Sequence, residues 1–190
     1  TPLYSSAASD VYKRQGITSP SPLIDLPVSK WDKLLNVNTR ATLLLAQAAY
    51  PALKESKGAL VAVASMSGMG AHPGMGAYSP SKAALISLCQ VLAQEWACDG
   101  INVNTVSPGM IRTPLTQKVY ENNQIAKERA ALVPWGRVGN PEDISNVISF
   151  LLSPEANYIT GQNILVDGGF VDSLYRHIPG LPDSSEIDKT

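Results

Sequence analysis

The sequence has few residues of the kinds that mark metalloproteins and disulfide-rich domains. Among 190 residues it has only two histidines and two cysteines. His72 and His177 are not spaced as metal ligands. Cys89 and Cys98 lie nine residues apart in one predicted helix and so point to different sides of it. We therefore expect no metal site and no disulfide, and two reduced, packed thiols suit a reducing compartment such as the cytoplasm.

Charge and long apolar runs are also lacking. The formal net charge of -1 gives no electrostatic footprint for nucleic acid or for an anionic membrane. No apolar run reaches the roughly 18–20 residues that a membrane-spanning helix needs. Hydrophobic residues make up 44% of the chain, enough to bury the core of an ordinary domain. The composition therefore predicts one soluble domain that binds neither nucleic acid nor membrane.

Residues 1–15 differ in character from the rest of the chain. They have no helical or strand period, end in a polar, basic run, and lack the apolar stretch of a secretory signal. We interpret 1–15 as a non-native or scar segment and leave it out of the predicted fold. The folded domain is expected over 16–172, and the Pro- and charge-rich residues 173–190 are expected to form a surface tail.

From residue 16 onward, helical and strand-like patterns alternate. The expected elements are a helix capped by Ser29 and ended by Lys57-Gly58, a strand over 59–64, a helix over 78–98, a strand over 101–106, a helix starting at Asn140 and a strand over 164–166. Pro51 is expected to kink the first helix or end its main part. Residues 110–138 are loosely patterned. Such alternation predicts an α/β fold with a doubly wound, Rossmann-like parallel sheet.

Polar or glycine-rich turns follow the predicted strands. Ser65 follows the first strand, Ser107-Pro108-Gly109 closes the second, and Asp167-Gly168-Gly169 follows the last. Ligands bind beyond the carboxyl ends of parallel strands, so we expect one site at this edge. For Asp167-Gly168-Gly169, turn formation alone is the favoured explanation.

Tyr78 and Lys82 lie four residues apart at the start of a predicted helix, so they project from nearly the same face. A phenol beside an ammonium loses its proton more easily than its ordinary pKa of ~10 suggests. Ser65, 13 residues before Tyr78, is placed to hydrogen-bond the same reacting oxygen. The three side chains predict a proton-transfer site. The alternatives are an exposed helix pair and a serine that caps a turn.

Taken in order, these motifs resemble the short-chain dehydrogenase/reductase family from residue 16 to about 170. The similar motifs are Tyr78-Ser79-Pro80-Ser81-Lys82 for Y-x-x-x-K, Ser65-Met66-Ser67-Gly68 for S-x-x-G, Asn38 for the asparagine of the preceding helix, Gly16 for the last residue of N-N-A-G, Pro108 to Thr113 for P-G-x-I-x-T, and Val166 to Gly169 for the closing strand. Y-x-x-x-K alone is weak evidence, whereas the whole ordered set is specific.

The resemblance implies an NAD(P)-dependent oxidoreductase that interconverts a secondary alcohol and a ketone. It makes Tyr78 the general acid/base, and Lys82 the cation that lowers its pKa and binds the nicotinamide ribose. Ser65 would polarise the substrate carbonyl, and Asn38 would hold a water that links Lys82 to solvent. The residues implied to contact NAD or NADP are Gly16, Tyr78, Lys82, Pro108, Gly109, Ile111 and Thr113.

Other interpretations of the same residues remain open. Asn38 is also explained as a helix-interior residue bonded to backbone, and Thr113 as a cap of the next segment. A non-catalytic family member that serves binding or scaffolding is one rival function. A serine hydrolase with Ser65 as nucleophile and Lys82 as base is another, although the sequence has no G-x-S-x-G elbow.

One family motif is not found in the sequence. No glycine-rich pyrophosphate-binding motif precedes Gly16. The residue whose charge selects NAD or NADP is missing there as well. We therefore predict that the sheet lacks its N-terminal strands, and that this 190-residue chain neither binds the cofactor tightly nor acts alone. The full-length protein is expected to form a homodimer or homotetramer through the helices of Trp31 and Tyr78, with 110–138 as substrate lid.

Overall fold

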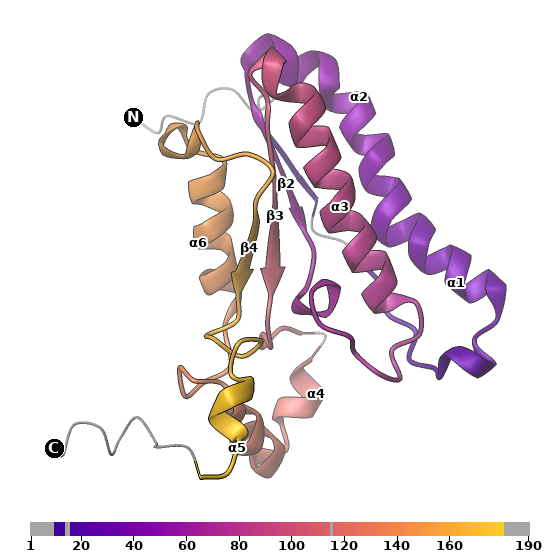
Figure 1. Ribbon diagram of the computed structural model, residues 1–190, viewed down its shortest axis with the longest axis vertical. Helices are drawn as coiled ribbons and strands as arrows, with labels where there is room; N and C mark the ends of the chain where they lie inside the picture. Colours follow the sequence, from indigo (N-terminus) through magenta and orange to yellow (C-terminus); the bar gives the residue numbers. More distant parts are fainter. Residues whose placement is uncertain (1–9, 14–15, 115, 181–190) are drawn as a thin grey trace, which may run out of the picture.

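A parallel sheet forms the middle of three layers (Figure 1) in the computed structural model, which describes residues 10–13, 16–114 and 116–180. Its strands, in sheet order as in chain order, are β1 (Asp10–Lys13), β2 (Ala59–Val63), β3 (Asn102–Pro108) and β4 (Asn163–Val166). All neighbouring strands pair in parallel. The predicted α/β class and parallel sheet are confirmed.

Strand β1 corrects the prediction for the first fifteen residues, which left 1–15 out of the fold. Asp10–Lys13 pairs with Ala59–Ala62 of β2. Because main-chain hydrogen bonds form the ladder, a short extended segment can join the open edge of a strand without an alternating side-chain pattern. Pattern analysis therefore missed this strand. Residues 1–9 and 14–15 lie outside the described part of the chain.

The long helix predicted after the proline-rich segment is a continuous helical rod. It consists of α1 (Val28–Leu35), the π-helical turn η2 (Asn36–Arg40) and α2 (Ala41–Ser56). The rod begins directly after Pro27, so the predicted cap at Ser29 is wrong. Pro51 lies inside α2 and does not end it. The end is as predicted, at Lys57, which has a left-handed φ of 51°.

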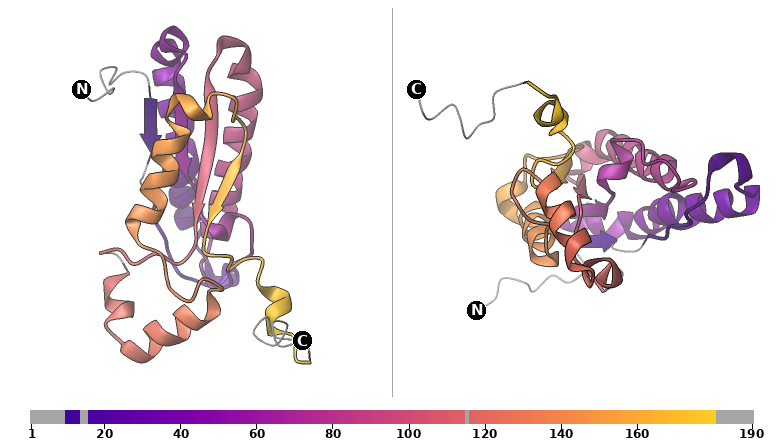
Figure 2. Two further views of the ribbon diagram at one scale, coloured as in Figure 1. Left: turned by 90° about the vertical axis from the view of Figure 1, so that its left-hand side faces the viewer. Right: turned by 90° about the horizontal axis from the view of Figure 1, so that it is seen from below.

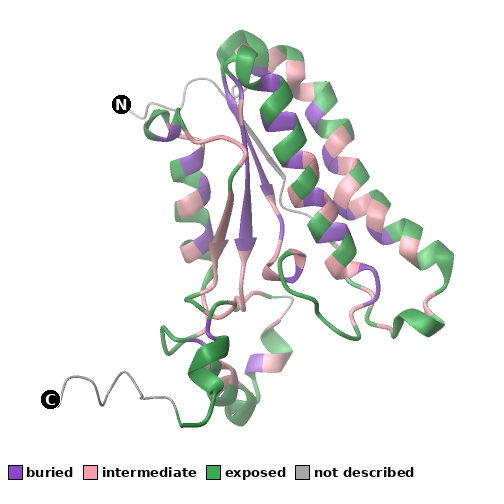
Figure 3. Cartoon of the chain, viewed as in Figure 1, coloured by how far each residue is buried: buried purple, intermediate pink, exposed green. Residues whose placement is uncertain are grey.

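Helix α3 (Tyr78–Trp96) lies beside this rod and packs against β3, while α6 (Pro141–Leu151) covers the opposite face of the sheet (Figure 1). The inner face of α3 buries large side chains such as Leu85 and Trp96. Cys89 is buried there as expected, but Cys98 is exposed, so the prediction of two packed thiols is wrong for Cys98. Two helical layers thus enclose the strands, and burial is concentrated between the layers (Figure 3).

The loosely patterned segment 110–138 contains two helices, α4 (Gln117–Tyr120) and α5 (Asn123–Leu132). Both lie beyond the carboxyl ends of the strands (Figures 1 and 2). Asn122 caps α5, because its side chain accepts hydrogen bonds from the first turn. The short turns elsewhere are η1 (Leu23–Asp25), η3 (Met66–Gly68), η4 (Ala97–Asp99), η5 (Pro154–Ala156) and η6 (Leu174–His177).

The predicted surface tail begins with a buried residue. Ser173 is buried, whereas Leu174 and Tyr175 of η6 are exposed. Residues 181–190 of the predicted tail lie outside the described residues. Over the described ranges, no helix combines the length and the apolar character needed to cross a membrane.

Candidate active site

The carboxyl ends of β2, β3 and β4 meet at one edge of the sheet. The N–H of Ala64 donates to the carbonyl of Val106 at 2.7 Å, and the N–H of Gly109 donates to the carbonyl of Val166 at 2.9 Å. The turns that follow these three strands are therefore neighbours. The predicted meeting of strand ends is confirmed.

Ser65 and Tyr78 meet where the loop after β2 returns to α3. The Ser65 Oγ accepts a hydrogen bond from the N–H of Ser67 at 3.2 Å, and the same hydroxyl lies near enough to the Tyr78 phenol to affect its pKa. Burial raises the pKa of Tyr78 above its ordinary value, and the nearby Ser65 hydroxyl works in the opposite direction. The phenol therefore keeps its proton at neutral pH and can act as a donor.

Lys82 lies one turn further along α3 and is only 4% exposed. Its Nζ donates to the carbonyl of Val63 at 2.9 Å and lies 5.9 Å from the centre of the Tyr78 ring. Burial of the phenol outweighs the lowering effect of Ser65, so the net shift of the Tyr78 pKa is upward, and the lowering by Lys82 stays a prediction. Lys82 still supplies a buried cation next to a phenol.

Asn38 is fully buried in η2, and its carboxamide is almost completely occupied by protein groups. Its Oδ1 accepts from the N–H of Ile17 at 2.8 Å, while its Nδ2 donates to the carbonyl of Ile17 at 3.0 Å and to the Oγ of Ser81 at 2.9 Å. The side chain thus joins residue 17 to the first turn of α3. Only the second lone pair of Oδ1 is left for the predicted water, so the backbone-bonding alternative describes this side chain.

Ser81 is a member of this site that the sequence analysis missed. Its Oγ donates to the carbonyl of Tyr78 at 2.7 Å while accepting from Asn38, and its own carbonyl accepts from the Oγ1 of Thr39 at 2.8 Å. Ser81 therefore connects the η2 turn to the backbone of Tyr78. The available signal was a small hydroxyl residue inside Y-S-P-S-K.

Gly16 lies against the same cluster. A Cβ atom at this position would stand 3.1 Å from the Nζ of Lys82 and 3.2 Å from the Oδ1 of Asn38. These two side chains fill the space that a side chain at position 16 would need, so glycine fits here. The contact of Gly16 with a cofactor stays a prediction.

The turn after β3 carries the remaining predicted cofactor contacts. Pro108 ends the strand, and Ile111 and Thr113 follow it. The N–H of Thr113 donates to the Oγ1 of Thr116 at 2.9 Å, and the same Oγ1 donates to the carbonyl of Ile111 at 2.9 Å. The Thr116 side chain makes no capping hydrogen bond to α4, and its hydroxyl lies 3.2 Å from that of Thr113.

A hollow of about 400 Å³ lies beside the loop between Ser65 and Tyr78. His72 belongs to its wall and is exposed, as predicted for a surface loop, with its Nδ1 3.2 Å from the Oγ of Ser67. Within the described ranges, no three His, Cys, Asp or Glu side chains form a group that could hold a metal ion.

The titration of Tyr78 can be predicted from these contacts. Changing Ser65 to alanine is expected to raise the pKa of Tyr78 further, because burial remains while the hydroxyl that favours the phenolate is lost. A raised pKa means that this tyrosine stabilises the fold fully below its ordinary pKa of ~10, and that the contribution is lost as the pH rises through the folded value. Ultraviolet titration of Ser65→Ala and the parent chain, each against its Tyr78→Phe form, measures this one phenol. A value below ~10 in the parent would contradict the prediction.

The chain is similar to a family of known proteins and to individual relatives. Residues 11–171 match the family described as Enoyl-(Acyl carrier protein) reductase. A 3-oxoacyl-[acyl-carrier-protein] reductase of Thermotoga maritima is 40% identical over 158 residues, which are 82% of this chain and 63% of the relative. A (3R)-3-hydroxyacyl-CoA dehydrogenase of Mus musculus is 38% identical over 168 residues, 87% of this chain and 64% of the relative.

The fold is similar to solved structures as well. A 4-hydroxyisoleucine dehydrogenase complexed with NADH has a TM-score of 0.81 and 34% identity, over 86% of this chain and 68% of that chain. This chain spans somewhat less than two thirds of the length of the curated relatives that it matches. The matched region includes part of the segment 1–15 and every motif at the strand ends. The chain therefore belongs to the short-chain dehydrogenase/reductase family.

Proposed function

We propose that the protein is an NAD(P)-dependent oxidoreductase that interconverts a secondary alcohol and a ketone. One observation carries the proposal: the partly buried Tyr78 phenol lies near the Ser65 hydroxyl and next to the buried ammonium of Lys82. A bound nicotinamide supplies or accepts the hydride, and the residues of the chain handle the proton. The relatives named as reductases and dehydrogenases support this chemistry.

The roles of the three side chains follow from their chemistry. In the direction of reduction, the Tyr78 hydroxyl gives its proton to the substrate oxygen as negative charge develops there. Ser65 donates a hydrogen bond to the same oxygen and stabilises that charge. Lys82 stabilises the phenolate that remains and binds the ribose hydroxyls. The reverse reaction returns the proton from the alcohol to Tyr78.

We infer a 3-oxoacyl or 3-hydroxyacyl thioester as the substrate class. Both curated relatives are named for a group at the third carbon of an acyl chain. The predicted lid 110–138 carries apolar side chains suited to an acyl chain, and Leu132 and Trp135 among them are exposed. NAD and NADP are both retained as cofactors.

The proposal is tested with the full-length protein, NADH or NADPH, and a 3-oxoacyl thioester, with a simple ketone for comparison. We expect the cofactor to be oxidised faster with the thioester than with the simple ketone. The same assay shows whether NADH or NADPH is preferred. Cofactor binding without oxidation by any carbonyl compound would favour the alternative, a non-catalytic binding or scaffolding protein. A separate NAD(P)H titration tests the prediction that this 190-residue chain does not bind tightly.

We also propose a homodimer or homotetramer with the α1–α2 rod and α3 at the main contact. Leu44 and Leu45 of α2 and Val91 of α3 are exposed apolar residues on these helices. Sedimentation of the full-length protein tests the assembly, and Leu45→Glu is expected to shift it toward the monomer. The free thiols of Cys89 and Cys98 support a cytoplasmic location, which cell fractionation tests.

A further inference from the structure

Two backbone hydrogen bonds tie the turn after β3 to the loop that precedes α6. The N–H of Arg112 donates to the carbonyl of Gly139, and the N–H of Gly139 donates to the carbonyl of Met110, both at 2.9 Å. The backbone of Gly139 is therefore hydrogen-bonded to the residues on both sides of Ile111. The position of the turn depends on where the backbone of Gly139 is held.

Gly139 fits closely against the residue between these two bonds. It forms an isolated parallel bridge with Ile111, and a Cβ at position 139 would stand 2.5 Å from the Cδ1 of Ile111. The same Cβ would stand 3.4 Å from the Oδ2 of Asp143. A side chain at position 139 would therefore collide with Ile111 of the turn and approach Asp143.

Arg137 and Asp143 hold the loop around Gly139. The Nη1 of Arg137 lies 2.7 Å from Oδ2 of Asp143, and its Nη2 lies 2.9 Å from Oδ1, so the pair is bidentate. Oδ2 also accepts the N–H of Asn140 at 2.7 Å. One carboxylate thus fixes the residues on both sides of Val138-Gly139 and anchors them to the start of α6.

Because this ion pair is exposed, we expect it to orient the Arg137 loop more than to stabilise the whole fold. Its side chains are 46% and 34% exposed, and pairs so accessible to solvent contribute little to global stability. Bidentate geometry does fix the relative orientation of the two groups. The guanidinium holds the pKa of Asp143 at about 2, so the pair is charged at every pH at which the protein is expected to work.

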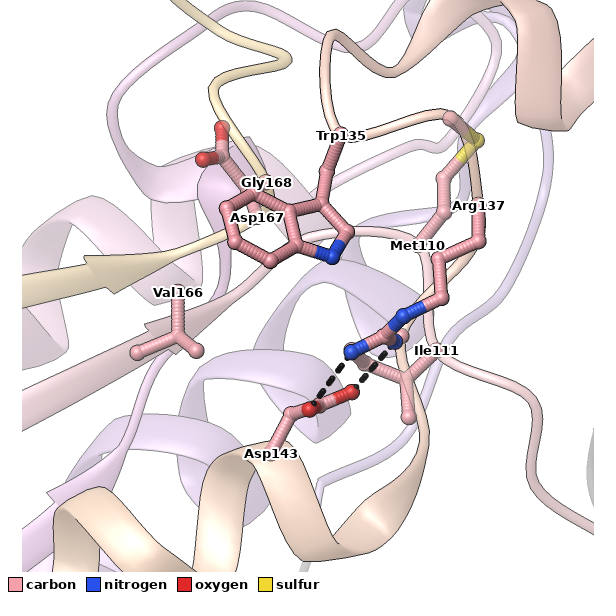
Figure 4. Close-up of a pocket in the computed structure, with 9 residues that line it drawn as sticks. Met110, Ile111, Trp135, Arg137, Asp143, Val166, Asp167 and Gly168 are labelled. Atoms are coloured by element: carbon pink, nitrogen blue, oxygen red, sulfur yellow. Dashed lines mark hydrogen bonds and ion pairs between the residues drawn. The ribbon is translucent and has the colours of Figure 1, made fainter.

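The pair also borders a pocket of about 210 Å³ whose other walls include Trp135, Ile111 and Val166 (Figure 4). Ile111 thus lies between this pocket and Gly139. A displacement of the Arg137 loop would change the support of Ile111 from both directions.

We propose that Arg137 and Asp143 are positioning residues that hold the turn 110–113 in the geometry that receives the nicotinamide end of the cofactor. They act through Gly139 and touch neither cofactor nor substrate. The consequence for the cofactor rests on the proposed function, whereas the consequence for the turn does not.

Hydrogen exchange and cofactor affinity test the two consequences separately. In Arg137→Gln, the amides of Arg112 and Gly139 are expected to exchange at least about tenfold faster, while the amides of β2 keep their protection. Asp143 still caps α6 in this variant through Asn140. In the full-length variant, the KM for the cofactor is expected to rise about tenfold with kcat little changed, because a misplaced turn weakens binding and leaves the proton donor intact.

Asp99→Asn is the matched control. It breaks the other ion pair found among the described residues, between Lys54 and Asp99 at 2.7 Å, whose side chains are 54% and 17% exposed and lie on elements remote from the turn. In this variant, the amides of Arg112 and Gly139 are expected to exchange as in the parent protein. The KM for the cofactor is also expected to equal that of the parent. Arg137→Lys is expected to restore part of the protection.

Parent-like exchange at both amides in Arg137→Gln would overturn the inference. Faster exchange with an unchanged cofactor KM would overturn the role in cofactor binding. If the parent protein does not use NAD(P)H at all, the proposed function fails. The two amides then still decide whether the ion pair holds the turn.

Discussion

Replacing Tyr78 by phenylalanine is expected to lower kcat/KM of the full-length protein about 100- to 10,000-fold, because the substrate oxygen loses its general acid. The change removes the hydroxyl near Ser65 and leaves the half-buried ring in place. Lys82 keeps its bond to the carbonyl of Val63. Cofactor affinity and the unfolding temperature are therefore expected to stay close to those of the parent, and the loss should lie in kcat.

Steady-state kinetics at saturating cofactor measure this loss, and Tyr158→Phe is the control. Tyr158 is 99% exposed, and its change to phenylalanine removes the same hydroxyl group from a position to which we assign no role. Its kcat/KM should equal that of the parent. Undiminished turnover by Tyr78→Phe would contradict the proton-donor role and favour a non-catalytic family member.

Local patterns predicted the central elements of the fold well. The apolar run at 59–64 corresponds to a strand at 59–63, because a strand buried on both faces needs a continuous apolar run. The strand predicted over 101–106, which alternates apolar and polar residues at its start, is observed at 102–108. The edge strand β1 carries no such requirement, since it needs only main-chain donors and acceptors. The start of α1 after Pro27 was likewise missed, because proline supplied an extended residue where a side-chain cap was expected.

In the site, too, features set by local sequence patterns were predicted, and features set by the three-dimensional surroundings were missed. Tyr78 and Lys82 share a helix face, and Ser65 ends a strand, so their neighbourhood follows from spacing and topology. The direction of the Tyr78 pKa depends on how much protein surrounds the phenol, which the sequence does not specify. Arg137 and Asp143 meet only because the loop between them turns around Gly139.

Gly109→Ala is expected to have the other large effect, because it places a methyl group where two strand ends touch. The Cβ of an alanine at this position would overlap the Cβ of Asp167 and stand 2.7 Å from its Cα. Backbone must therefore move. Overpacking of this kind costs roughly 1–3 kcal/mol, and urea unfolding of the chain is expected to detect a loss of that size.

The movement would also reach the proposed cofactor site. The N–H of Gly109 donates to the carbonyl of Val166, and the Asp167 carboxylate accepts from the N–H groups of Gly169 and Val171, at 2.9 and 2.8 Å. Separating the strand ends strains these bonds and displaces the turn 110–113, which we propose receives the nicotinamide. Cofactor affinity of the full-length protein should therefore fall at least about tenfold.

Gly70→Ala is the matched control for this steric argument. A Cβ at position 70 meets nothing within 4 Å, and neither Gly70 nor Gly109 has a left-handed backbone, so both substitutions are conformationally allowed. The free energy of unfolding of Gly70→Ala should lie within about 0.5 kcal/mol of the parent. Equal stability and equal cofactor affinity of Gly109→Ala and Gly70→Ala would mean that the contact with Asp167 does not fix the turn.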